Sequence, residues 1–100
     1  MDAVSAIKNS IGAGSLYFFL PDGPFGRPFD NQYWFDDVFE KDGEIHLKLK
    51  RDTSFVFSGP VSAKFDGSRL SITGFTNLVF SPDGKSKRSY SSGEVSIELC

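Results

Sequence analysis

The chain has 100 residues, of which 39% are hydrophobic and 24% charged, the composition of one ordinary folded domain over residues 1–100. Its net charge of −2 and pI near 5.2 exclude the overall basic character typical of nucleic-acid-binding proteins. The single cysteine, Cys100, excludes an internal disulfide, and no segment reaches the roughly 18 apolar residues of a membrane span. The first residues lack the basic start and apolar run of a signal peptide, so the default expectation is a cytoplasmic location.

The first predicted element is a helix over residues 2–11, DAVSAIKNSI. Val4, Ile7 and Ile11 recur at the spacing of one helix face, with polar residues between them. Gly12 is placed to end the helix. Because so short a helix is marginal by itself, we expect its apolar side to pack against the rest of the chain.

The remainder of the chain, residues 15–99, reads as short strands separated by turn residues. Its four Asp-Gly pairs are typical of tight hairpin turns, because glycine adopts positive φ and aspartate forms local hydrogen bonds. Several segments alternate apolar and polar residues, as around Ile45, Leu47 and Leu49, which indicates antiparallel strands with one buried face. The predicted strands are about eight: 15–20, 32–39, 44–50, 53–58, 61–65, 69–75, 77–81 and 94–99.

These elements predict an all-β fold with one N-terminal helix. We expect about eight short antiparallel strands in a meander that forms a curved sheet or small barrel, with the helix plugging one end or covering an open face. A two-sheet β-sandwich is the alternative that this pattern leaves open. The eleven phenylalanines suit such a core, because wide aromatic side chains fill the gaps between strands.

The segment from Gly23 to Trp34, GPFGRPFDNQYW, departs from the strand pattern. Its two prolines fix φ and favour extended neighbours, so we expect a stiff loop anchored by its phenylalanines. Asp30 and Asn31 suit the turn that leads into the next strand. Within the loop, FGRPFDN at 25–31 resembles a string found in small bacterial β-rich proteins of unassigned function. The resemblance implies a loop of a β-rich family, and it brings no activity and no site.

The strand QYWFDDVF, residues 32–39, contains two adjacent aspartates, so either alternation places one carboxylate on the apolar face. A β-bulge at this point would let both Asp36 and Asp37 face water. The second solution is a buried aspartate paired with Arg27 of the preceding loop, since an unpaired buried carboxylate is strongly unfavourable. The third interpretation is functional, in which Arg27 and an aspartate line the mouth of a pocket.

Large aromatic side chains remain on the outer face of this strand whichever alternation holds, and SLYFFL at 15–20 repeats the problem. The chain must therefore fold into a thick two-layer structure or expose an apolar patch for a partner. Tyrosine, tryptophan and arginine are the residue types enriched at the centres of protein interfaces. The candidate binding residues are accordingly Arg27, Asp30, Asn31, Tyr33, Trp34, Asp36 and Asp37.

The basic run KSKRSY, residues 85–90, follows a predicted turn. Together with Lys48, Lys50 and Arg51, it would form a positive patch that carries Tyr90, and aromatic rings beside basic residues bind single-stranded nucleic acids. The alternative is a solvated loop tip, which the acidic pI favours. The candidate nucleic-acid-binding residues are Lys85, Lys87, Arg88 and Tyr90.

The sequence shows no catalytic or metal-binding motif, and its one histidine, His46, is predicted on the wet face of a strand. We therefore expect no enzyme activity, no metal and no cofactor. The leading hypothesis is a binding module that uses the aromatic surface for a protein partner or for self-association. The alternatives are a β-barrel that holds a small apolar or anionic ligand in a Phe-lined cavity, and weak binding of single-stranded nucleic acid. No membrane association is expected.

Overall fold

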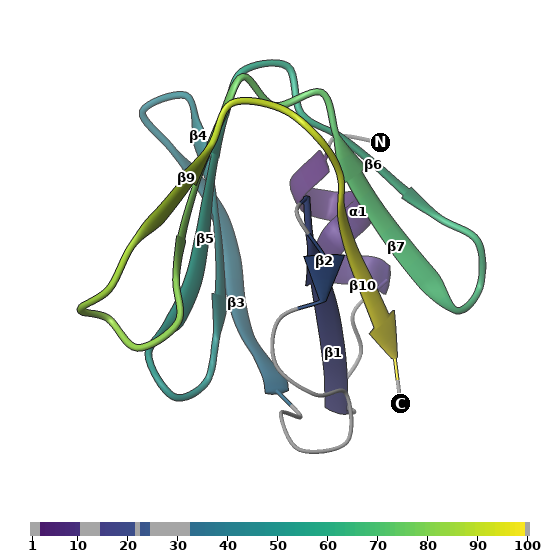
Figure 1. Ribbon diagram of the computed structural model, residues 1–100. Helices are drawn as coiled ribbons and strands as arrows, with labels where there is room; N and C mark the ends of the chain where they lie inside the picture. Colours follow the sequence, from purple (N-terminus) through teal and green to yellow (C-terminus); the bar gives the residue numbers. More distant parts are fainter. Residues whose placement is uncertain (1–2, 11–14, 22, 25–32, 100) are drawn as a thin grey trace.

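The structure is a computed structural model that describes residues 3–10, 15–21, 23–24 and 33–99 (Figure 1). Within these ranges it has one helix and ten strands, which confirms the predicted all-β fold with an N-terminal helix. Residues 2 and 11, the predicted ends of the helix, lie outside the described ranges. The elements are α1 (Ala3–Ser10), β1 (Ser15–Leu20), β2 (Gly23–Pro24), β3 (Tyr33–Lys41), β4 (Glu44–Leu49), β5 (Thr53–Ser58), β6 (Ser62–Phe65), β7 (Arg69–Thr73), β8 (Asn77–Ser81), β9 (Arg88–Tyr90) and β10 (Val95–Leu99).

The strands form one antiparallel sheet in the order β6-β7-β10-β1-β3-β4-β5-β8-β9, with β2 paired to β1. The sheet bends into two facing layers: layer A holds β6, β7, β10 and β1, and layer B holds β4, β5, β8 and β9 (Figure 1). At one corner β3 joins the layers, because it pairs with β1 through Tyr33 and Trp34 and with β4 beyond them. The links β5–β6, β7–β8 and β9–β10 cross between the layers at the top of the view.

The predicted curved sheet is confirmed, whereas the closed barrel is wrong for this chain. Strands β6 and β9 end the strand order, and each pairs with a single neighbour within the described residues. Helix α1 contacts β6 of layer A and β3 at the corner. It therefore covers the opening between the layers, in agreement with the prediction of a helix over an open face. Its Ile7 side chain is fully buried.

The hydrophobic core lies between the two layers. Phe18 of layer A packs against Phe55 and Phe80 of layer B, with ring centroids 5.0 and 5.4 Å apart. These rings therefore pack into the interior between the two layers. The alternation in β4 is confirmed, since Ile45, Leu47 and Leu49 are all buried. The buried hydrophobic residues are Ile7, Leu16, Phe18, Leu20, Val38, Ile45, Leu47, Leu49, Phe55, Phe57, Leu70, Ile72, Phe75, Leu78, Phe80, Val95 and Ile97.

The Asp-Gly pairs after Gly23 mark hairpin turns as predicted. Asp42 and Gly43 have φ of 54° and 79° and join Lys41 directly to Glu44, which is a two-residue turn between β3 and β4. The pairs that begin at 66 and 83 lie between β6 and β7 and between β8 and β9. The pair at 22–23 begins outside the described residues.

A β-bulge in β3 resolves the conflict between Asp36 and Asp37. The register with β4 shifts between Phe35 and Asp37, so that Phe35 lies opposite Leu49 and Val38 opposite Leu47. Both carboxylates are exposed, which makes the interpretation of a buried aspartate wrong. The extra residue changes the alternation, and it lets Phe35 and Val38 share the inner face while the charges stay in water.

Candidate functional site

The predicted aromatic residues lie at the corner where β3 passes from layer A to layer B. Trp34 is 37% exposed, whereas Tyr33 is half-buried with its ring 4.9 Å from that of Phe18. Burial raises the pKa of the Tyr33 hydroxyl, and the charge of Arg51 opposes that shift. The corner thus has a packed tyrosine and an outward tryptophan. Three other candidate residues, Arg27, Asp30 and Asn31, lie outside the described residues.

Trp34 is tied to the turn between β4 and β5. The Lys50 amide donates a hydrogen bond of 2.9 Å to the Trp34 carbonyl. The Arg51 guanidinium lies over the indole, 5.6 Å from the ring centroid, which is a cation–π contact. Within the described part of the chain, Arg51 makes no ion pair and is exposed. Among the described residues, the aromatic ring of Trp34 is therefore the contact that orients this charged group. We call Tyr33, Trp34, Lys50 and Arg51 the Trp34 corner.

The turn that carries Arg51 has an unusual backbone. Arg51 and Asp52 have φ of 68° and 59°, although neither is glycine. Left-handed backbone at an ordinary L-residue costs roughly 1–2 kcal/mol, because the Cβ approaches the following carbonyl. The turn is held by Thr53, which is 1% exposed and donates its hydroxyl to the Pro82 carbonyl at 3.0 Å. Tertiary contacts therefore impose a conformation that the local sequence disfavours.

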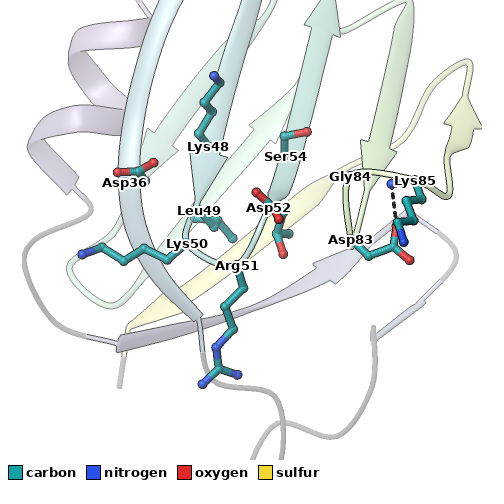
Figure 2. Close-up of a pocket in the computed structure, with 11 residues that line it drawn as sticks. Asp36, Lys48, Leu49, Lys50, Arg51, Asp52, Ser54, Asp83, Gly84 and Lys85 are labelled. Carbon is teal, nitrogen blue, oxygen red and sulfur yellow. Dashed lines mark hydrogen bonds between the residues drawn. The ribbon is translucent and has the colours of Figure 1, made fainter.

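An open cleft of about 800 Å³ lies beside the Trp34 corner (Figure 2). Three segments line it: the β3 bulge, the β4–β5 turn and the β8–β9 turn. Its polar floor includes Ser54 of β5, and Leu49 contributes an apolar side chain. Four of its lining side chains are cationic and three are anionic, an excess of one positive charge (4 − 3). These are Lys48, Lys50, Arg51 and Lys85, and Asp36, Asp52 and Asp83.

The β8–β9 turn is a rigid wall of this cleft. The Asp83 carboxylate accepts hydrogen bonds from the backbone amides of Ser86 and Lys85, at 2.7 and 2.8 Å. These bonds lower the pKa of Asp83, because they favour its charged form. Gly84 lies so close to the opposite turn that a Cβ added there would be 3.4 Å from that of Asp52. The two turns therefore pack against each other within the lining of the cleft.

The structure assembles only part of the predicted basic patch. Lys85 shares the cleft with Lys48, Lys50 and Arg51, as the prediction of a joint patch required. Tyr90, however, lies in β9 opposite Leu78 and packs against the hydrophobic core, so its ring is not an outward stacking platform. Sequence reasoning placed residues 85–90 in a loop and missed β9, because three residues are too few for a visible alternation. Lys87 is exposed before β9, and Arg88 begins it.

A second aromatic group lies on the outer face of layer B. The rings of Phe39 and His46 stack with centroids 5.0 Å apart and an angle of 5° between planes, and the Lys48 ammonium lies 5.5 Å from the Phe39 centroid. The predicted outward position of His46 is confirmed. The stacking of Phe39 on His46 was not predicted. The signal for it was the Asp42-Gly43 pair, because a two-residue turn there places Phe39 opposite His46.

The described residues contain no group of three or more histidine, cysteine, aspartate or glutamate side chains that could hold a metal ion. Among the same residues, no helix has the length and apolar character needed to cross a membrane. No family model, curated protein or solved structure matches the chain.

Proposed function

We propose that the chain is a non-catalytic binding module and that the Trp34 corner binds a protein partner. The observation that carries the proposal is the Trp34 indole, 37% exposed and covered on one face by the Arg51 guanidinium. Tryptophan and arginine dominate binding energy at protein interfaces, because the indole buries a large rigid surface and the planar guanidinium donates several hydrogen bonds. An exposed pair of this kind at the rim of a cleft is suited to a partner's side chains.

The placement of the corner supports this role. Trp34 lies at the junction of β1, β3 and the β4–β5 turn, where backbone hydrogen bonds hold it. A binding residue on such rigid elements loses little freedom when it binds, which favours affinity. The cleft adds polar and charged groups next to the indole, so the whole surface has the mixed apolar and polar character of a transient interface.

Trp34 is the only tryptophan, so its fluorescence reports on this corner alone. In affinity capture from the native source, we expect Trp34→Ser to lose partners that the wild-type chain retains. Phe65→Ser is the matched control, because Phe65 is 43% exposed in β6 of layer A. Purified partner should shift the Trp34 emission to shorter wavelength. The proposal is wrong if both variants retain the same partners and saturating partner leaves the emission unchanged. Sedimentation equilibrium identifies the case in which the partner is a second copy.

A further inference from the structure

We infer that Arg51 is the specificity residue of the Trp34 corner and that it recognises a carboxylate side chain in an acidic segment of the protein partner. This inference rests on the proposed function and adds the chemistry of the ligand. Three properties of Arg51 carry it: its backbone conformation, the absence of an ion pair to any described residue, and its orientation by Trp34.

The backbone at Arg51 indicates that the fold does not select arginine at this position. Its φ of 68° suits glycine or asparagine, which adopt left-handed backbone readily. The Arg51 side chain is exposed and makes no ion pair within the described ranges. Strained residues of this kind cluster at binding and catalytic sites, where the strain maintains a functional geometry. No described residue thus accounts for an arginine at this position, which suits a role in binding.

The contact with Trp34 prepares Arg51 for a planar anion. The contact with the indole restricts the orientation of the guanidinium, and its N–H groups form no ion pair with any described residue. A carboxylate accepts two parallel hydrogen bonds from such a fork, an arrangement that a lysine ammonium cannot reproduce. Lys50, on the same turn, adds positive potential beside it. The apolar neighbour of the carboxylate would then lie against the exposed indole.

The charges of the cleft favour an acidic peptide over a nucleic acid. A polyanion that followed the cleft would meet the carboxylates of Asp36, Asp52 and Asp83 as well as the cations. Figure 2 shows the Arg51 side chain extending away from Asp83, toward the outside of the cleft. A single carboxylate can therefore reach the guanidinium from the side that faces away from Asp83.

The test uses the indole N–H signal in ¹⁵N-correlated NMR spectra, which is unique because the chain has one tryptophan. The probes are the capped peptides acetyl-Glu-Leu-Glu-Leu-amide and acetyl-Gln-Leu-Gln-Leu-amide, which match in length and shape and differ in charge. We expect the acidic peptide to shift the indole signal in a saturable way, with an affinity at least tenfold higher than that of the neutral peptide. A difference of this size corresponds to roughly one charge-assisted bidentate contact.

Substitutions at Arg51 separate its fork geometry from its charge. Arg51→Gly keeps the turn foldable because glycine suits the observed φ, and it should reduce the acidic peptide's affinity about tenfold or more. Arg51→Lys keeps the charge and should still lose affinity severalfold, since the bidentate contact is gone. Lys64→Gln, an exposed cation of β6 in layer A, is the control and should bind as the wild type does.

Each contrary result has a distinct meaning. Equal affinity for the two peptides overturns the inference and leaves the proposed function in place, because the corner then binds apolar groups alone. No indole shift with either peptide also overturns the inference, while the capture experiment with Trp34→Ser still decides the proposed function. If Lys64→Gln lowers the affinity for the acidic peptide as much as Arg51→Gly does, only the overall charge of the chain matters and the inference is wrong. Tighter binding of an oligothymidine than of the acidic peptide assigns the corner to nucleic acid instead.

Discussion

The two turns at the ends of β4 perform the same task with opposite local chemistry. At one end, Asp42 and Gly43 adopt positive φ in a sequence suited to it. At the other end, Arg51 and Asp52 adopt similar φ values without a glycine. The first turn is explained by its own residues. The second is explained only by the contacts that its residues make elsewhere, with Trp34, with Pro82 through Thr53, and with the β8–β9 turn.

This contrast distinguishes turns that their own sequence explains from turns that point to a function. A turn whose sequence agrees with its conformation needs no further explanation, whereas a locally disfavoured turn must be held by the rest of the fold. Such positions are expected at functional sites, and here the disfavoured turn carries the cation that lies on the exposed indole.

The largest expected effect comes from removing the hydrogen bond that stabilises the turn at Arg51 and Asp52. Thr53→Val removes the hydroxyl that donates to the Pro82 carbonyl and preserves the side-chain shape. Because Thr53 is buried and the carbonyl loses a partner, we expect the free energy of unfolding to fall by about 1–3 kcal/mol. Urea denaturation measures the change. Thr73→Val, at a half-buried threonine of β7, is the control, and equal losses in the two variants would show that the bond does not support the turn.

The second effect compares matched glycine positions in the two turns. Gly43→Ala should cost about 1–2 kcal/mol through backbone strain alone, since no atom lies within 4 Å of the added Cβ. Arg51→Gly relieves similar strain. Two losses offset this gain in stability: glycine adds about 0.5–1 kcal/mol of conformational freedom to the unfolded state, and a cation–π contact of about the same size is lost. We therefore expect near-zero change in its free energy of unfolding. If the free energy of unfolding fell as much in Arg51→Gly as in Gly43→Ala, Arg51 would be required for stability of the fold.

The smallest effect concerns the pH dependence of the β8–β9 turn, which packs against the second turn. The folded-state pKa of Asp83 lies below the usual value of 3.8, because backbone amides of Ser86 and Lys85 bond its carboxylate. Its stabilising contribution is therefore complete above about pH 4 and is lost as the pH falls through the lowered pKa. Wild type and Asp83→Asn should differ in thermal midpoint at pH 7 and converge near pH 2. A constant difference across this range would contradict the assignment.

Much of the fold was predictable because its signals are local. The alternation around Leu47, the Asp-Gly turns and the bulge required by Asp36 and Asp37 each follow from a few neighbouring residues. The open edges of the sheet were not predictable in this way, since closure depends on whether β6 and β9 meet. No local signal distinguishes a closed barrel from two bent layers with free edges.

The candidate site was predictable only in part, for the same reason. Tyr33 and Trp34 were identified from their residue types and from the excess of aromatic side chains. The position of Arg51 over the indole depends on its left-handed backbone, which an arginine does not signal. Tyr90 shows the opposite case, because it was assigned to an outward patch and its strand pairing turns it toward the core.

The strand order also sets when each layer can be built during synthesis. The consecutive hairpins β3–β4 and β4–β5, which start layer B from the corner strand, need only residues 33–58. In layer A, β10 lies between β1 and β7, so β1 waits for Val95–Leu99 before it can pair on that side. Contacts so distant in sequence form late, because a long loop must close first. Tyr17 and Phe19 of β1 thus lack their neighbouring strand β10 until residues 95–99 have left the ribosome.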